Sequence, residues 1–183
     1  MQTPLRWLVV LCAVTFFLGL GNGAIADSDE AFYAEAARQM VMTGDWLTPH
    51  YNDTVRFQKP VLMYWLIGAG YLLTGVNEAA ARFPSAFAGL LLVLLTFTIG
   101  RRWYNASTGF LAGSIVATTF GTSAIAWQAL PDLPVTVLIV FATWSLLRAL
   151  SWNPIDAGDR EAVNSDSHRR TWLLAAAAST ALA

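Results

Sequence analysis

Apolar residues in this chain fall into long runs separated by polar stretches, rather than alternating at the period of a half-buried helix or strand. A helix that crosses a bilayer needs about 20 mainly apolar residues. The runs therefore predict an all-α integral membrane protein with several spans. The predicted spans are residues 5–24, 84–100, 108–129 and 133–150, followed by an incomplete span at 172–183.

Composition agrees with the membrane class. Of the 183 residues, 56% are hydrophobic and 13% are charged, whereas a soluble domain carries about 25% charged residues. The net charge of -1 gives no electrostatic basis for a nucleic-acid partner. The single cysteine, Cys12, lies in an apolar run. We interpret it as a packing residue, because nothing near it in the sequence would activate its thiol.

A shorter apolar stretch, residues 60–76, decides the topology. Basic residues gather on the cytoplasmic side of membrane proteins, and the arginines around the predicted spans share one side only if residues 60–76 do not cross. We therefore predict an interfacial or re-entrant helix there, an outer loop at residues 25–83 and a cytoplasmic loop at residues 151–171. The arginines concerned are Arg6, Arg101, Arg102, Arg148, Arg160, Arg169 and Arg170.

The first predicted span also fits a second interpretation. Arg6, the apolar run after it and the small residues Ala24-Ile25-Ala26 together resemble a signal peptide with a cleavage site. Cleavage there would start the mature chain at Asp27 and remove the first span. The length of the apolar run and the spans that follow it favour an uncleaved helix.

The outer loop begins with the signals of a short amphipathic helix at about residues 29–43. Ser28 is a suitable N-cap, and Asp29 and Glu30 would lie in the first turn, where carboxylates interact favourably with the helix dipole. Gly44 is a typical residue just beyond a helix C-terminus. We expect this helix to lie along the membrane surface.

The same loop carries a dense motif pattern. It reads D-E-A-x-Y-A-E-x-A-R-x-M, then G-D-W, P-x-x-N, F-x-K-P, Y-W and G-V-N-E-x-A-A-R. This pattern resembles the bacterial aminoarabinose-transferase and protein-mannosyltransferase-like group, whose members have the GT-C fold, a multi-span helical bundle. Beyond residue 84 the resemblance rests on hydropathy and on Leu130-Pro131-Asp132. The matching outer-loop residues are Asp29, Glu30, Ala31, Tyr33, Ala34, Glu35, Ala37, Arg38, Met40, Gly44, Asp45, Trp46, Pro49, Asn52, Phe57, Lys59, Pro60, Tyr64, Trp65, Gly75, Val76, Asn77, Glu78, Ala80, Ala81 and Arg82.

The resemblance implies an enzyme of the inner membrane. It would move a sugar from a polyprenyl-phosphate donor to a glycolipid, glycan or protein acceptor on the outer face. Asp29 matches the family aspartate that acts at the acceptor hydroxyl, and a carboxylate in a partly dry site suits that proton transfer. Lys59 matches the family lysine that contacts donor phosphate through charge-assisted hydrogen bonds. The candidate substrate-binding residues are Glu30, Tyr33, Arg56, Lys59, Arg82 and Asp132.

One position departs from the family pattern. Related sequences read F-E-K-P, whereas this chain has Phe57-Gln58-Lys59-Pro60. A neutral amide thus replaces an acid that would help to hold a divalent metal or to position the donor, and either role would be weakened or altered here. No metal-binding residue is predicted, and the need for a metal cofactor stays open. His50 and His168 are isolated from other ligand types, and we interpret both as solvated loop residues.

Each candidate residue also has a simpler structural interpretation. Asp29 would stabilise its helix as a first-turn acid, Glu30 would do the same or hydrogen-bond to a neighbouring loop, and Asp132 would cap the helix that follows it. Lys59 would reach lipid phosphates as any interfacial lysine does. Tyr33 would belong to an aromatic belt at the membrane surface.

The whole chain has an alternative interpretation as well. The last apolar run stops at Ala183 before it completes a span, and a half-helix leaves backbone groups poorly satisfied in lipid. On that ground the chain would be the N-terminal portion of a larger GT-C domain. The alternative is a non-catalytic membrane subunit or an inactive truncated remnant of such an enzyme.

Overall fold

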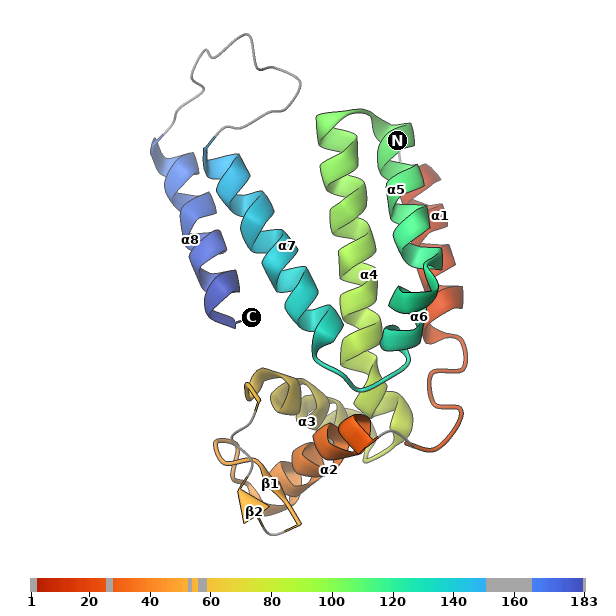
Figure 1. Cartoon of the computed structure of the whole chain (residues 1–183), viewed down its shortest axis with the longest axis vertical. Helices are drawn as coiled ribbons and strands as arrows, with labels where there is room; N and C mark the ends of the chain where they lie inside the picture. The colour runs from red at the N-terminus through yellow and green to blue at the C-terminus, as the bar shows by residue number, and fades with distance from the viewer. Residues whose placement is uncertain (1–2, 26–27, 53, 56–58, 151–165, 183) are drawn as a thin grey trace.

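The computed structural model describes residues 3–25, 28–52, 54–55, 59–150 and 166–182. An upright bundle of helices stands on a smaller layer of structure at one end (Figure 1). The bundle contains α1 (Thr3–Cys12), continued by a π-helical segment (Ala13–Phe17), α4 (Glu78–Trp103), α5 (Ala106–Thr118), α6 (Phe120–Ala126), α7 (Asp132–Ala149) and α8 (Asp166–Leu182). The smaller layer, called the lateral layer below, contains α2 (Ser28–Thr43), the antiparallel strands β1 (His50–Tyr51) and β2 (Thr54–Val55), and α3 (Leu62–Thr74).

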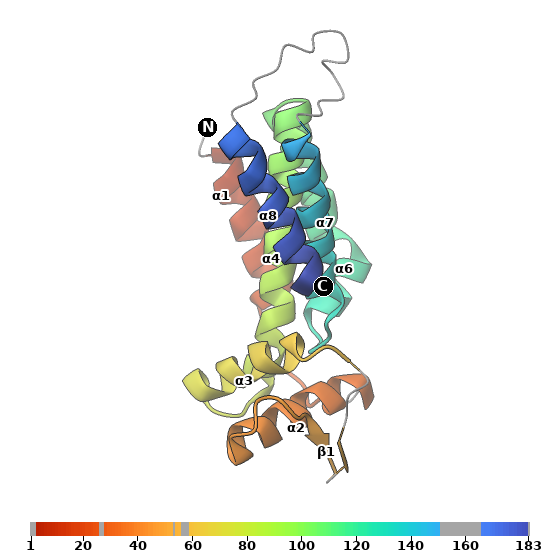
Figure 2. The ribbon, with the colours of Figure 1, turned by 90° about the vertical axis from the view of Figure 1, so that its left-hand side faces the viewer.

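The helices of the lateral layer run crosswise to the bundle (Figure 2). α2 and α3 occupy the two stretches predicted as interfacial helices, residues 29–43 and 60–76. Gly75, in the left-handed region at φ 82°, turns the chain out of α3, a conformation that glycine adopts without steric cost. Asn77 then caps α4, because its side-chain oxygen accepts a hydrogen bond from the Ala80 N–H at 2.9 Å.

Two helices in the described ranges, α4 and α7, are long and apolar enough to cross a bilayer. α5 and α6 meet the same criterion only as one bent pair, with 59° between them. The predicted span 108–129 is therefore broken at Thr119, whose backbone is extended (φ -64°, ψ 126°). The number of crossings and the sidedness of the loops remain predictions.

The chain ends differ in detail from the expected spans. α8 starts at Asp166, ahead of the predicted residue 172, and packs along α7 (Figure 1). Most of the predicted loop 151–171 lies outside the described residues. At the other end, the span predicted for residues 5–24 is helical only as far as Phe17.

An irregular linker, residues 18–25, replaces the second half of that predicted span. Gly19 and Gly23 have positive φ angles of 80° and 83°. These angles cannot be part of a right-handed α-helix, in which φ is about −63°. At the helix end, the indole N–H of Trp127 donates to the Thr15 carbonyl oxygen at 3.0 Å. The linker leads directly into the lateral layer. Because it is not helical, its backbone carbonyl oxygens accept hydrogen bonds from groups outside a helix.

Two hydrophobic cores stabilise the two parts of the molecule. The bundle core contains Leu8, Cys12, Phe16, Leu20, Ala86, Ala88, Val93, Phe97, Ala117, Ala126 and Leu133. The core of the lateral layer contains Tyr33, Ala34, Ala36, Ala37, Met40, Met63, Tyr64, Ile67, Tyr71, Ala80, Ala81 and Ala129. The second core includes the first turn of α4 and the loop before α7, so the lateral layer is packed onto the bundle.

Candidate active site at the junction of bundle and lateral layer

The first turn of α2 gives two neighbouring carboxylates opposite environments. Asp29 is exposed, whereas the Glu30 side chain is buried. Neighbouring residues on a helix point in different directions because a turn takes 3.6 residues. One carboxylate therefore faces outward while the next one enters the junction between α2 and the bundle.

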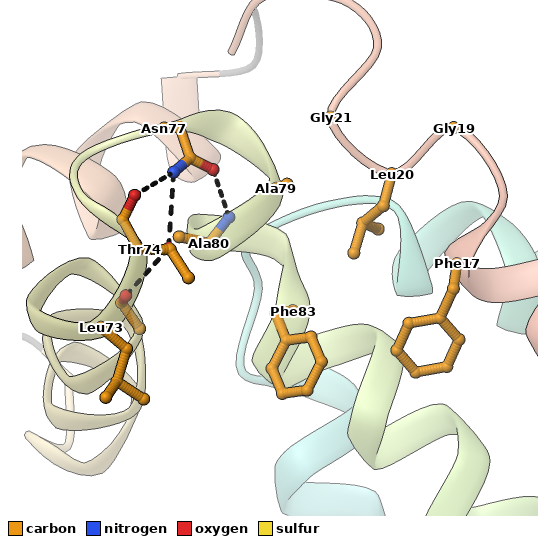
Figure 3. A pocket seen from close by; sticks show the side chains of 11 residues that line it. Phe17, Gly19, Leu20, Gly21, Leu73, Thr74, Asn77, Ala79, Ala80 and Phe83 are labelled. Carbon is orange, nitrogen blue, oxygen red and sulfur yellow. Dashed lines mark hydrogen bonds between the residues drawn. The ribbon is translucent and has the colours of Figure 1, made fainter.

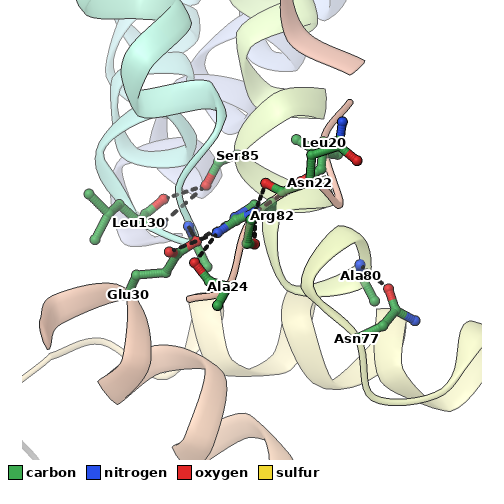
Figure 4. A network of polar contacts seen from close by, with 11 residues as sticks. Leu20, Asn22, Ala24, Glu30, Asn77, Ala80, Arg82, Ser85 and Leu130 are labelled. Atoms are coloured by element: carbon green, nitrogen blue, oxygen red, sulfur yellow. Dashed lines mark hydrogen bonds and ion pairs between the residues drawn. The ribbon is translucent and has the colours of Figure 1, made fainter. Parts of the chain in front are cut away.

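Within the junction, Glu30 forms a bidentate ion pair with Arg82 of α4 (Figure 4). The Arg82 Nε–H donates to Glu30 Oε1 at 2.8 Å, and Nη2 donates to Oε2 at 3.3 Å. Both residues are buried. A buried ion pair is stable only when its remaining donors and acceptors are also satisfied, and both partners meet that condition here.

The remaining N–H groups of Arg82 bind the linker. Nη1 donates to the carbonyl oxygens of Leu20 and Asn22 at 3.2 Å each and of Gly23 at 3.1 Å. Nη2 donates to the Ala24 carbonyl oxygen at 3.3 Å. One guanidinium thus supplies the donors that the irregular linker lacks.

The loop before α7 joins the same network. Glu30 Oε1 accepts a second hydrogen bond from the Ala129 N–H at 3.0 Å. Next to it, the Ser85 hydroxyl of α4 donates to the Leu130 carbonyl oxygen at 2.7 Å, and the Leu130 N–H lies 3.2 Å from the same hydroxyl. The network therefore connects the linker, α2, α4 and the start of α7.

The second exposed candidate carboxylate, Asp132, lies close in sequence to this network. Asp132 follows the bound residue Ala129 by three positions, and it is exposed in the first turn of α7. The N-cap of α7 is Pro131, and no side chain caps the helix. The sequence-based alternative of a capping role for Asp132 is therefore wrong. Along the chain, Asp29 directly precedes Glu30 and Asp132 follows Ala129 by three residues, and Glu30 and Ala129 are in contact.

The other candidate residues lie within the lateral layer or outside the described ranges. Tyr33 is buried, with its ring 5.2 Å from that of Tyr64 on α3. Lys59 is exposed shortly before α3. Arg56 and Gln58 lie outside the described residues. The structure thus brings Glu30 and Arg82 into direct contact. Asp29 and Asp132 are close to this network along the chain, and among the described residues no contact joins Lys59 to Glu30 or Arg82.

A second arginine–glutamate pair on α2 differs from the buried one. Arg38 and Glu35 are one helical turn apart, with 2.7 Å between Nη2 and Oε1, and their side chains are 39% and 29% exposed. Hydrogen bonding from Arg38 lowers the pKa of the Glu35 carboxyl below its usual value. Such a surface pair contributes about 0.5 kcal/mol or less to stability, and it connects α2 to no other element.

Two concave regions adjoin the junction. One, of about 540 Å³, is lined on its polar side by Thr15, Asn22, Glu30, Arg82, Ser123 and Gln128. The other, of about 590 Å³, is an apolar groove between the linker, α3 and α4 (Figure 3). Phe17, Leu20 and Phe83 contribute its larger side chains. Among the described residues, no three His, Cys, Asp or Glu side chains come together as a metal site would require.

Sequence reasoning missed the partners that hold these acids. The sequence-based candidates included Glu30 and Arg82, but nothing in the pattern indicated that the two residues, 52 positions apart, bind each other. Ser85 and the backbone of Ala129 were not singled out, because a serine in an apolar helix and a main-chain N–H carry no motif. Only the tertiary contacts identify them.

The architecture and its likeness to a solved structure define the class of protein: a helical membrane bundle of GT-C type, with a buried glutamate–arginine pair at its junction with a lateral layer. The chain belongs to the dolichyl-phosphate-mannose-protein mannosyltransferase family. That family's model matches residues 58–157, more than half of the chain.

Several known proteins are similar to this chain. A protein of Aquifex aeolicus is 35% identical over 142 residues, which cover 76% of this chain and 28% of the relative. An undecaprenyl phosphate-alpha-4-amino-4-deoxy-L-arabinose arabinosyl transferase of Pectobacterium atrosepticum is 36% identical over 146 residues, 78% of this chain and 26% of the relative. The crystal structure of ArnT from Cupriavidus metallidurans bound to undecaprenyl phosphate aligns with a TM-score of 0.82 and 27% identity, covering 96% of this chain and 30% of that one. The chain thus spans about 30% or less of each of these proteins.

Proposed function

We propose that this chain is part of a membrane glycosyltransferase. The enzyme transfers a sugar from a polyprenyl-phosphate donor to a glycolipid, glycan or protein acceptor on the outer face of the cytoplasmic membrane. The observation that carries the proposal is a pair of exposed carboxylates close in sequence to the buried Glu30–Ala129 contact: Asp29, next to Glu30, and Asp132, three residues after Ala129. Family membership and the likeness to an undecaprenyl-phosphate-bound ArnT support the donor class.

Asp29 has the position of a general base in this proposal. An acceptor hydroxyl is a poor nucleophile until its proton is removed, and a carboxylate within hydrogen-bond reach assists that removal. Asp29 lies in the first turn of α2, where a carboxylate interacts favourably with the helix dipole. Asp132 contacts the substrate from the α7 side of the junction and helps to orient it.

The donor phosphate needs cations near the same surface. We assign that role to Lys59, which is exposed shortly before α3, and to Arg56, three residues before it in the sequence. Charge-assisted hydrogen bonds from ammonium and guanidinium groups suit a phosphate oxygen. Tyr33 is buried against Tyr64, which favours a packing role under this surface over a direct substrate contact.

The test uses the full-length protein in membranes supplied with a radiolabelled prenyl-phosphate sugar. Replacing Asp29 by Asn keeps the shape and removes the base, so transfer falls by about 100-fold or more, while the protein still inserts into the membrane. The matched control is Glu35→Gln, which neutralises a second acid of the same helix away from the junction and leaves transfer near the parent rate. Full turnover by Asp29→Asn would exclude Asp29 as the base.

A further inference from the structure

We propose that Arg82 is a positioning residue that sets the geometry of the two exposed carboxylates and does not bind the donor phosphate. It acts through Glu30 and through the linker at residues 18–25. Its effect on catalysis rests on the function proposed above. The contacts of Arg82 do not depend on that function, and they are tested by an experiment that needs no activity measurement.

The first observation is that the guanidinium is fully engaged by protein oxygens. An arginine side chain has five N–H donors on three nitrogens. All three nitrogens of Arg82 donate, two of them to Glu30 and two of them to linker carbonyls, in six contacts of 2.8 to 3.3 Å. Each nitrogen of this buried side chain already has oxygen acceptors within the protein, so a phosphate could bind Arg82 only by displacing one of them.

The second observation is where these contacts fall along the chain. Ala24 precedes Asp29 by five residues and Glu30 follows it directly, and both are bound by Nη2 of the same guanidinium. The chain that carries Asp29 is therefore anchored on both sides to one point of α4. Moving Asp29 relative to the bundle requires breaking a buried ion pair.

The third observation concerns the other carboxylate. Glu30 Oε1 binds the Arg82 Nε–H and the Ala129 N–H at once, and Ala129 lies three residues before Asp132. The position of Glu30 therefore sets the start of α7 as well as the start of α2. Arg82 and Glu30 together fix the separation between Asp29 and Asp132.

The geometry also explains why the residue is arginine. Its planar fork serves two carboxylate oxygens and several carbonyls in fixed directions, whereas a lysine ammonium is a compact group with three donors. Arg82→Lys keeps the charge and loses most of the contacts. We expect it to give an intermediate effect, between the parent and a neutral replacement.

The kinetic arm of the test measures kcat and KM for a prenyl-phosphate sugar in the full-length protein. A misplacement of about 1 Å at reacting groups costs about 100-fold in rate, so Arg82→Gln and Glu30→Gln each lower kcat by that order with little change in KM. The double variant is no worse than either single one, because both changes break the same network. Arg38→Gln, which breaks the surface pair on α2, leaves kcat unchanged.

The structural arm does not depend on activity. In a Cys12→Ser background, Ala129→Cys places a thiol at a site that is fully buried beside Glu30, and its reaction with a maleimide reports whether the junction is closed. Labelling is slow in the parent and in Arg38→Gln, faster in Arg82→Gln and Glu30→Gln, and intermediate in Arg82→Lys. If the Arg82→Gln protein does not accumulate, the kinetic and the labelling measurements are made on Glu30→Gln and Arg82→Lys instead.

The outcomes separate this inference from the proposed function. Unchanged labelling in Glu30→Gln and Arg82→Lys, or a raised KM with kcat retained, would overturn the positioning role and point to a phosphate contact. If Asp29→Asn keeps full turnover while the Arg82 variants still speed labelling, the assignment of the base is wrong and the positioning of the junction stands.

Discussion

At the scale of single residues, burial separates the acids of the junction into two groups. Glu30 is enclosed and has three hydrogen bonds from protein donors, so its charge is already matched. Asp29 and Asp132 are exposed at the first turns of two helices. An acid whose only role was to stabilise a helix start would contribute about 0.3 to 1 kcal/mol to the free energy of unfolding. Replacing such an acid would lower stability by that amount and leave the reaction rate unchanged.

The residue-scale prediction concerns Asp132. Asp132→Asn in the full-length protein lowers kcat by about 100-fold, because the substrate is less well oriented. The free energy of unfolding falls by no more than about 1 kcal/mol, the contribution of a first-turn acid. Transfer assays and thermal unfolding of the purified protein measure the two effects. Asp45→Asn is the control, since that carboxylate caps a turn through the Leu47 and Thr48 N–H groups, away from the junction. A loss of stability without a loss of turnover would make Asp132 a structural residue.

The sequence identified most of these residues but not what they do to one another. Asp29, Glu30 and Arg82 stand out because a motif surrounds them. Glu30 and Arg82 were both candidate substrate residues, and a hydrogen bond to a neighbouring loop was the alternative for Glu30, which its contact with Ala129 matches. The contact between Glu30 and Arg82, which spans 52 residues of sequence, was not predicted. Motif spacing carries no information on such a pair, because the approach of the two segments depends on the glycine-rich linker and on the start of α4.

At the scale of elements, hydropathy predicted helices but not their interruptions. The stretches 29–43 and 60–76 form α2 and α3, whose ends are marked by local signals such as Gly44 and Gly75. The bend at Thr119 lies in a run that is apolar on both sides, so a hydropathy window passes over it. The hairpin of β1 and β2, with two residues in each strand, is too short to give an alternating pattern.

The element-scale prediction concerns the close approach of α4 and α5. A Cβ on Gly109 would lie 2.6 Å from the Phe97 carbonyl oxygen and 2.7 Å from the Arg101 backbone nitrogen, and backbone atoms cannot move aside cheaply. Gly109→Ala therefore destabilises the protein by about 1 to 3 kcal/mol, as overpacking does, measured by thermal unfolding in detergent. Gly121→Ala on α6, where the added methyl meets nothing within 4 Å, leaves stability unchanged or raises it. Equal effects of the two changes would contradict a tight contact between α4 and α5.

At the scale of the whole molecule, the length of α4 relates the two ends of the bundle to the two faces of a membrane. Its 26 residues extend about 39 Å at 1.5 Å per residue, which exceeds a hydrocarbon core of about 30 Å. Arg101 and Arg102 lie in its last turn, at the end away from the lateral layer (Figure 1). Because arginines favour the cytoplasmic side, the lateral layer and the junction are predicted to face outward.

Labelling of single cysteines in a Cys12→Ser background tests this orientation in intact cells. Leu47→Cys marks the lateral layer and Tyr104→Cys marks the opposite end, and the native side chains are 76% and 62% exposed. A maleimide that cannot cross the membrane should label the first and not the second until the cells are opened. The reverse pattern would put Asp29 and Asp132 in the cytosol, and no acceptor on the outer face would then reach them. Labelling of both in intact cells would mean that α4 does not cross or that α3 crosses as well, because a single crossing between residues 47 and 104 separates the two sites.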